Sequence, residues 1–270
     1  MSDKDLVDNM ERIWSSLSAL CDSLSQDDWK LPTACPGWSV QDQLSHLVGN
    51  ESRILGRALP VHIPRQTDHV KNETGARNEI PVDWRRSWSG QQVLQEFREV
   101  TTERMQALRA LMEEDFTKET DTPAGVNTVR ELLGRRIFDA WVHEQDIRRA
   151  VSRPGNLEGP VADHAMNRLA MAMPYVVGRK AQAPDGSTVV FEVTGPAGRT
   201  LPVAVEGQRA KYLDEVPNSP TVRLTMDMET FSSVGCGRIP LDEVQADNRV
   251  QIEGDQHLGQ KVLEQMNIMV

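Results

Sequence analysis

The sequence of 270 residues lacks an excess of basic charge, a long apolar run and a set of paired cysteines. Lys and Arg number 30 against 40 Asp and Glu, which gives a net charge of −10 at pH 7. This acidic balance argues against general DNA or RNA binding, which requires a basic face, and against a polybasic membrane anchor. No apolar run approaches the roughly 18–20 residues that span a bilayer. We therefore expect neither a nucleic-acid partner nor a membrane partner.

The cysteines are odd in number, and none belongs to a C-x-x-C pair: Cys21, Cys35 and Cys236. This pattern argues against a disulfide framework and against a structural zinc site built from thiolates. Cys35 is the candidate for a nucleophile, although a buried apolar cysteine is the commoner outcome. The N-terminus opens acidic and polar and contains no apolar signal core, so we expect a cytoplasmic location.

The first half of the chain has the pattern of a helical domain. Apolar residues recur at spacings of three and four in four stretches, which predicts four amphipathic helices: Leu6–Leu24, Val40–Leu55, Val93–Leu111 and Leu132–Ile147. Three of these stretches follow an N-cap signal: Ser39 with Asp42, Ser89 with Gln92, and Thr128 with Glu131. Residues 60–88 show no sustained period and hold three prolines, so we expect a long irregular connection there. Four long helices favour a four-helix bundle.

The second half changes character after a turn-rich segment at residues 152–160. A helix at 161–178 precedes β-branched stretches that predict strands: Thr188–Val193, Leu201–Val205, Thr221–Met226 and Val250–Glu253. Short helices are expected at 227–234 and 256–266. The sequence thus predicts a two-domain α+β protein, with a four-helix bundle in residues 1–155 and a small α+β domain in residues 156–270.

The segment from Phe138 to Arg149 carries the residues best suited to chemistry. Asp139, His143 and Asp146 are spaced by four and three residues, so they lie on one helical stripe. A carboxylate and an imidazole at this spacing can bind one metal ion, as the two histidines of the zinc motif H-E-x-x-H do. The same spacing also fits an ordinary hydrogen-bonded pair on a helix surface.

His46, in the second predicted helix, is the best candidate for a third metal ligand, because two other histidines lie in the irregular connection: His62 and His69. Asn50 and Arg53 share the stripe of His46 at i+4 and i+7, and we predict that they bind a cofactor. Two imidazoles, one carboxylate and an open position would resemble a catalytic zinc site with water as the fourth ligand. The histidines of the second half are expected at the surface: His164 and His257.

Two segments resemble the signatures of the mycothiol-dependent maleylpyruvate isomerase family, which lies in the wider DinB-like superfamily. The first is Cys35-Pro36-Gly37-Trp38 through His46-Leu47, and the second is Phe138-Asp139-Ala140-Trp141 through Arg148. Residues 189–193 and 254–259 resemble the sterol-carrier-like C-terminal domain of the same family. The resemblance implies a DinB-like four-helix bundle followed by a sterol-carrier-like α+β domain.

The resemblance also implies a divalent metal, usually zinc, held by His46, Asp139 and His143. The family's isomerase carries Glu where this chain has Asp139, so the site would shift, and Asp146 would either compete for the metal or support it from behind. Mycothiol, a low-molecular-weight thiol, is the implied cosubstrate. An arginine of the C-terminal domain is expected to bind an anionic substrate, as a catalytic residue, and the candidates are Arg238 and Arg223.

These features lead to one preferred function and two alternatives. The preferred function is a divalent-metal-dependent enzyme that activates a thiol for S-transfer to a small electrophile, or for thiol-assisted isomerisation of one, with S-transfer favoured. The first alternative is a non-catalytic protein that binds an apolar small molecule or lipid in a pocket lined by methionines: Met166, Met171, Met173, Met226 and Met228. The second alternative is a metal-dependent hydrolase of thiol conjugates. A monomer or a homodimer is expected.

Overall fold

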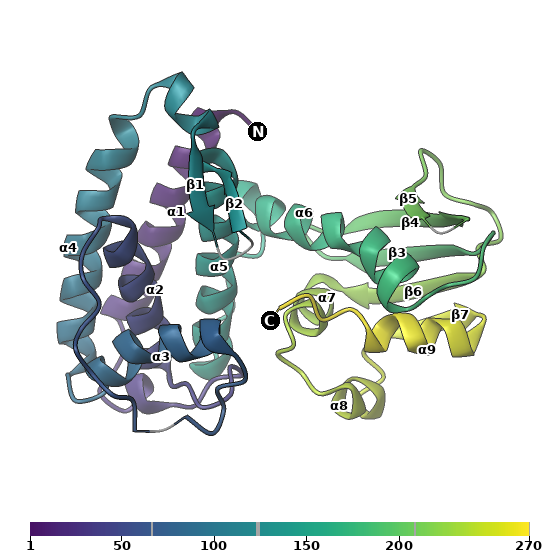
Figure 1. Cartoon of the computed structure of the whole chain (residues 1–270). Helices are drawn as coiled ribbons and strands as arrows, with labels where there is room; N and C mark the ends of the chain where they lie inside the picture. The colour runs from purple at the N-terminus through teal and green to yellow at the C-terminus, as the bar shows by residue number, and fades with distance from the viewer. Residues whose placement is uncertain (66, 123–124, 208, 270) are drawn as a thin grey trace. The chain divides into compact units, whose positions relative to one another are not determined.

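The computed structural model describes residues 1–65, 67–122, 125–207 and 209–269 (Figure 1). The chain divides into two units, Met1–Asn156 and Leu157–Val270. Within the described ranges, every helix is too short or too polar to cross a membrane.

Four long helices that run alongside one another form the first unit (Figure 1): α1 (Asp3–Asp22), α2 (Val40–Ile54), α4 (Gly90–Arg109) and α5 (Val129–Ala150). Each helix begins at a hydroxyl N-cap that accepts a hydrogen bond from the backbone N–H three residues on: Ser2, Ser39, Ser89 and Thr128. Helix α1 packs against α4 and α5, and α2 packs against α4 and α5 from the other side of the apolar core. The predicted four-helix bundle is confirmed.

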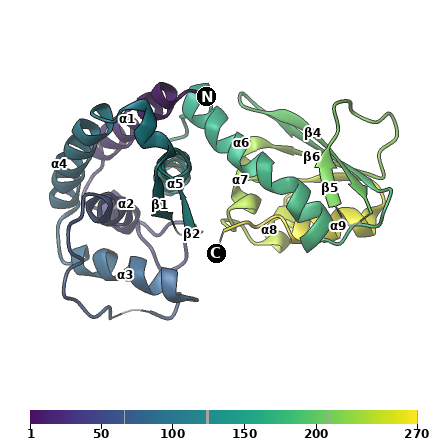
Figure 2. The same cartoon turned by 45° about the horizontal axis from the view of Figure 1, so that its top comes forward.

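The irregular connection predicted for residues 60–88 is wrong in its second half, because α3 (Glu73–Arg85) lies there. Pro81 concealed this helix, since a proline inside a helix removes one backbone hydrogen bond and usually ends it. Here the Pro81 ring lies against Gly49 of α2, where an added Cβ would be 2.8 Å from it. The packing of α3 on α2 (Figure 2) therefore offsets the lost hydrogen bond.

Small elements that the sequence pattern does not predict complete the first unit. They are the 3₁₀ turns η1 (Asp28–Lys30) and η2 (Glu113–Thr117) and a hairpin of β1 (Glu119–Thr122) and β2 (Gly125–Thr128). Both strands have mixed polar sequences without apolar alternation, which removes the usual signal for a strand.

A five-stranded mixed sheet in the order β5-β4-β3-β6-β7 forms the second unit. Its strands are β3 (Thr188–Thr194), β4 (Arg199–Glu206), β5 (Arg209–Tyr212), β6 (Val222–Asp227) and β7 (Gln251–Gly254). Strand β3 pairs parallel with β6 and antiparallel with β4, so that Phe191 lies opposite both Leu201 and Leu224. The predicted α+β character is confirmed.

The helices of the second unit are α6 (Gly159–Tyr175), the π turn η3 (Val176–Lys180), α7 (Met228–Gly235), α8 (Leu241–Ala246) and α9 (Gln256–Glu264). Helices α6, α7 and α9 contact the strands. Two expectations fail here. His164 is not a surface residue but is buried in α6, with 6% of its surface exposed. Met171 is 72% exposed on the same helix, so it cannot line an internal pocket with the other four methionines.

Candidate metal centre

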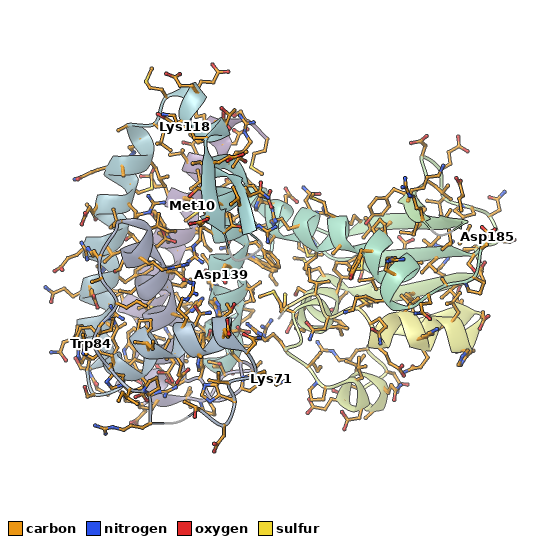
Figure 3. The ribbon with its side chains drawn as sticks, viewed as in Figure 1. Met10, Lys71, Trp84, Lys118, Asp139 and Asp185 are labelled. Carbon is orange, nitrogen blue, oxygen red and sulfur yellow. The ribbon has the colours of Figure 1, made fainter. Side chains whose placement is uncertain are left out.

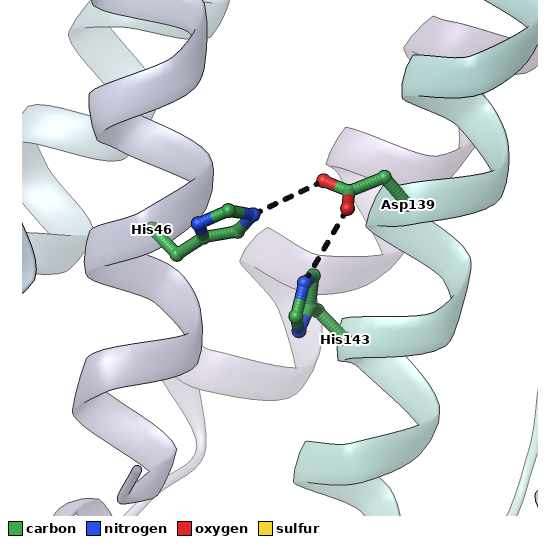
Figure 4. A group of neighbouring side chains, drawn as sticks. All are labelled: His46, Asp139 and His143. Atoms are coloured by element: carbon green, nitrogen blue, oxygen red, sulfur yellow. Dashed lines mark ion pairs between the residues drawn. The ribbon is translucent and has the colours of Figure 1, made fainter. Parts of the chain in front are cut away.

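Helices α2 and α5 bring His46, Asp139 and His143 together (Figure 4), and one ligand atom of each lies within 4.8 Å of the others. His46 Nε2 is 3.4 Å from Asp139 Oδ2, and His143 Nε2 is 3.5 Å from Asp139 Oδ1. Ligands at 2.0–2.1 Å from a tetrahedral zinc ion lie roughly 3.3 Å apart, so both the donor set and the spacing fit such an ion. Figure 3 places Asp139 near mid-length of the bundle, away from Lys118 at one end.

The start of α2 positions His46 and provides one side of the centre. Ser39 and Asp42 form the predicted capping box, which fixes the first turn of α2. Trp38, immediately before it, places its ring 5.0 Å from the ring of His46 and 5.8 Å from that of His143. The Trp38 indole Nε1 donates to Glu79 Oε2 of α3 at 2.9 Å. This apolar ring excludes water from one side of the two imidazoles.

The three residues differ in charge because their neighbours differ. Burial lowers the pKa of His46 to about 4, so its ring is neutral at pH 7. Burial would raise the pKa of Asp139, but the positive charges of Arg136 and His143 outweigh it and hold that pKa well below the usual range. Burial would likewise lower the pKa of His143, but the Asp139 charge and hydrogen bonding outweigh it, and the pKa is raised. The centre therefore pairs a neutral imidazole with a carboxylate and a proton-retaining imidazole.

A chain of hydrogen bonds fixes which nitrogen of His143 carries a proton. The Trp38 carbonyl can only accept, so the Thr33 hydroxyl donates to it at 2.8 Å. Thr33 Oγ1 then accepts from Gln43 Nε2 at 2.5 Å, which turns Gln43 Oε1 towards His143 Nδ1. Because Oε1 can only accept, Nδ1 must carry hydrogen. In the neutral ring, the lone pair is therefore on Nε2, the nitrogen that faces Asp139.

Asp139 is held from the opposite side by a buried ion-pair network. Arg136 Nη1 donates to Asp139 Oδ2 at 2.7 Å, and Arg136 Nε donates to Glu51 Oε1 at 2.7 Å. Arg104 Nε donates to the other oxygen of Glu51 at 3.0 Å. Glu51 is only 1% exposed, so this network fixes the carboxylate of Asp139 from within the core.

One of the two predicted residues of the α2 stripe contacts the centre. The amide Nδ2 of Asn50 is 2.9 Å from His46 Nε2 and donates to it when that ring nitrogen is unprotonated. Arg53 lies one turn further along, exposed, in the last turn of α2. Asp146 is fully buried, with Oδ2 3.6 Å from His143 Nδ1 and Oδ1 2.7 Å from Arg149 Nη2. Asp146 therefore faces Nδ1 of His143, whereas Asp139 faces Nε2.

The remaining predicted residues have other surroundings. Arg238 belongs to the second unit, is half-buried and donates from Nη1 to the Cys236 carbonyl at 3.1 Å. Arg223 pairs with Glu192 on the neighbouring strand at 3.1 Å, so its charge is engaged. Cys35 is half-buried in the turn before α2.

Sequence reasoning missed Gln43, Glu51 and Arg136, although each carries a signal. All three are polar residues on the core-facing sides of apolar helices. Gln43 and Arg136 each stand three residues before a candidate ligand, which places them on the ligand's side of the helix.

Comparison with protein families accounts for both units. Residues 10–148, just over half of the chain, match the family described as "Mycothiol maleylpyruvate isomerase N-terminal domain". The chain belongs to this family. Residues 167–266 match the SCP-2 sterol transfer family. The expected resemblance is confirmed for the bundle and for the α+β unit.

Solved structures of the family share the fold across nearly the whole chain. The crystal structure of the mycothiol-dependent maleylpyruvate isomerase matches with a TM-score of 0.59 and 14% identity, covering 94% of this chain and 93% of that one. A histidine-to-alanine mutant of that isomerase matches with a TM-score of 0.56, at the same identity and coverage. The comparison with curated proteins gave no significant match.

Proposed function

We propose that this chain is a divalent-metal-dependent enzyme that activates mycothiol or a similar small thiol for reaction with a small electrophile. The convergence of His46, Asp139 and His143 between α2 and α5 carries this proposal. Membership of a family named for a mycothiol-dependent isomerase supports the thiol, and imidazole with carboxylate ligation supports zinc.

The chain's own residues prepare the centre for a metal and a thiol. His46 presents a neutral ring, Gln43 directs Nε2 of His143 inward, and Arg136 orients Asp139. Asn50 and Arg53 lie along the same face of α2, where we propose that they contact the thiol cosubstrate. A bound divalent ion would lower the pKa of a thiol, about 8.5 when free, so that the thiolate is available near pH 7.

Such a thiolate can react with the electrophile in two ways, isomerisation and S-transfer. In isomerisation, sulfur bonds to one carbon of a conjugated double bond and the displaced electron pair moves to the carbonyl oxygen. The resulting single bond rotates, the electron pair returns, the C–S bond breaks and the thiolate leaves unchanged. In S-transfer, the C–S bond remains and the neighbouring carbon takes a proton. Both steps balance without an oxidant or a reductant.

Cis–trans isomerisation of maleylpyruvate in the presence of mycothiol tests the proposal. We expect turnover that requires both the thiol and the metal, that is lost on chelation and that returns with zinc. Formation of a stable thiol adduct without isomerised product would assign S-transfer instead. Turnover that persists in fully chelated protein, or without thiol, would overturn the proposal.

The second unit supports two further assignments. We propose that Arg238 binds a carboxylate of the electrophile, for which Arg238→Ala is expected to raise KM more than it lowers kcat. The match of residues 167–266 to the SCP-2 sterol transfer family favours an apolar ligand in this unit as a second candidate function. Retention of a lipid through purification, seen by native mass spectrometry, would support that candidate. A cytoplasmic location and a monomeric or homodimeric state stay predictions.

A further inference from the structure

Two aliphatic side chains project from the segment that connects α2 to α3. Val61 is 108% exposed and Ile63 is 88% exposed. His62, between them, turns inward, and its Nε2 lies 2.6 Å from Asp83 Oδ2 on α3. The backbone N–H of Arg65 donates to the same oxygen at 3.1 Å. These two contacts anchor the segment on α3, so the two aliphatic side chains are held outward on a fixed support.

A cleft of about 200 Å³ lies beside this projection, between α2, α3 and α4. Leu59 and Pro60, which directly precede the projection, line the cleft together with Pro81 and Trp84 of α3. An apolar cavity of about 150 Å³ accepts a molecule of benzene, so a cleft of this size accepts an aliphatic side chain. Trp84 is 36% exposed, and the Arg85 guanidinium lies 5.1 Å from its ring centroid. The cleft therefore has an aromatic wall that is supported by the chain itself.

The charges around the cleft are mostly neutralised within the chain. Two of its three lining arginines are paired, because Arg85 donates to both carboxylate oxygens of Glu96 at 2.7 and 2.8 Å, and Arg57 pairs with Glu103. An anionic membrane surface attracts clusters of several basic residues, and this chain has a net charge of −10. The surface therefore offers little attraction to anionic lipid and little repulsion to an identical surface.

A projection and a recess on one surface are what a two-fold interface requires, because each copy presents the same surface to the other. Exposed apolar patches mark interaction sites, and aromatic side chains are enriched at the centres of protein interfaces. We propose that this chain forms a homodimer in which Val61 and Ile63 of each copy pack into the cleft of the other, against Trp84. The proposed function does not enter this inference, since none of the candidate metal ligands takes part.

Sedimentation-velocity ultracentrifugation of the full-length chain over a range of concentrations tests the proposal. We expect a monomer–dimer equilibrium with a Kd in the micromolar range, because only a few apolar side chains of each copy become buried. The double variant Val61→Asp/Ile63→Asp would bury unpaired carboxylates in the interface, and we expect it to weaken dimerisation at least about 100-fold. Met171→Asp is the matched control, because Met171 is also apolar and 72% exposed but lies on α6. This variant should dimerise like the wild type.

A mixture of two single variants tests the geometry of the interface. Val61→Cys changes the projection, and Ala58→Cys changes the rim of the cleft. With one variant isotope-labelled, mild oxidation should give disulfides that join labelled to unlabelled chains, because a disulfide requires two Cα atoms within about 7 Å. Met171→Cys mixed with Ala58→Cys is the control, and we expect no such product from it. A dimeric sample that gives no cross-link between Val61→Cys and Ala58→Cys would overturn the assignment.

Other outcomes would also overturn the inference. A chain that stays monomeric at all concentrations, or a dimer that persists in the Val61→Asp/Ile63→Asp variant, excludes this interface. Binding of a monomeric wild type to phosphatidylglycerol vesicles, lost in the double variant, would assign the surface to lipid instead. Zinc uptake measured on the same samples separates the two proposals. A monomer that binds zinc removes only the dimer, and a dimer that binds no zinc removes only the proposed function.

Discussion

Two groups of histidines and carboxylates lie in the same bundle, and they differ in how their atoms are spaced. The metal centre is His46, Asp139 and His143, and its ring nitrogens stand 3.4 and 3.5 Å from the carboxylate oxygens. The other group, the α3 cluster, is His62, His69, Glu79, Asp83 and Arg86. In the α3 cluster, His62 lies 2.6 Å from Asp83, and His69 lies 3.0 Å from Glu79.

The α3 cluster is held together by hydrogen bonds and ion pairs between its own members. Arg86 Nη1 lies 2.7 Å from a carboxylate oxygen of both Glu79 and Asp83. Burial would raise the pKa of Asp83, but hydrogen bonds from His62 and Arg86 outweigh it and lower that pKa. Among the described residues, only the metal centre brings three ligand atoms within 4.8 Å of one another. Residue types alone therefore do not make a metal site. The donor atoms must also be too far apart to hydrogen-bond with each other directly, so that an ion fits between them.

The largest expected effect is on metal binding. His143→Ala removes one of three ligands, and we expect zinc affinity to fall by more than about 100-fold. His69→Ala is the matched control from the α3 cluster and should bind zinc like the wild type. Elemental mass spectrometry after equilibrium dialysis measures both, and circular dichroism checks that each variant folds. Equal zinc loss in the two variants would contradict the distinction between the groups.

Substitution in the α3 cluster, in contrast to substitution in the metal centre, is expected to lower stability and to leave zinc binding intact. Glu79 is 1% exposed and accepts from Trp38 while pairing with Arg86 and His69. Glu79→Gln leaves a guanidinium group without its full charge partner, and we expect the free energy of unfolding to fall by about 3 kcal/mol. Zinc binding in the folded fraction should persist. Urea denaturation measures the change, with Glu103→Gln, an exposed partner of Arg57, expected to stay within about 0.5 kcal/mol.

The sequence predicted those features of the fold and the metal centre that depend on the spacing of residues along one helix. The i, i+4 relation of Asp139 and His143 is set by the helix itself, and the Ser39–Asp42 cap fixes where His46 stands along α2. Apolar periodicity was sufficient for the four long helices, because burial of one face dictates it. Four strands of the second unit, β3, β4, β6 and β7, followed instead from β-branched stretches.

The rest depends on contacts between distant segments, which spacing does not encode. Helix α3 packs on α2 through Pro81 and Gly49, a contact that the sequence of residues 60–88 does not reveal. The role of Gln43 follows from a chain through Thr33 to the Trp38 carbonyl. Likewise, Glu51 joins Arg104 of α4 to Arg136 of α5, and only the assembled bundle shows this.

A smaller effect should follow from removing the support of a ligand. Gln43→Leu deletes the acceptor that holds the proton on His143 Nδ1. Loss of such an outer partner typically lowers metal affinity 10- to 100-fold, and we expect a value in that range. Gln41→Leu is the control, because Gln41 is equally buried on α2 but bonds Lys30 and the Arg85 carbonyl instead. Chelator competition measures both affinities, and equal losses would show that Gln43 acts only through packing.

The smallest expected effect is the number of protons released when zinc binds. This number distinguishes the protonation states of the two histidines of the centre. The pKa of His46 is lowered to about 4 and that of His143 is raised above 6.5, so at pH 6.5 the first ring is neutral and the second holds a proton. Metal must displace that proton, so zinc affinity should rise with pH until it passes the folded pKa of His143 and then level off. Calorimetry at pH 6.5 in buffers of different ionisation enthalpy should show release of roughly 0.5–1 proton per zinc, declining at higher pH. His62 of the α3 cluster is not a ligand of the proposed metal centre, so His62→Asn should leave the number of protons released per zinc unchanged. A proton release near zero at pH 6.5 would mean that His143 is already neutral at that pH. The Asp139 carboxylate would then not stabilise the protonated form of His143.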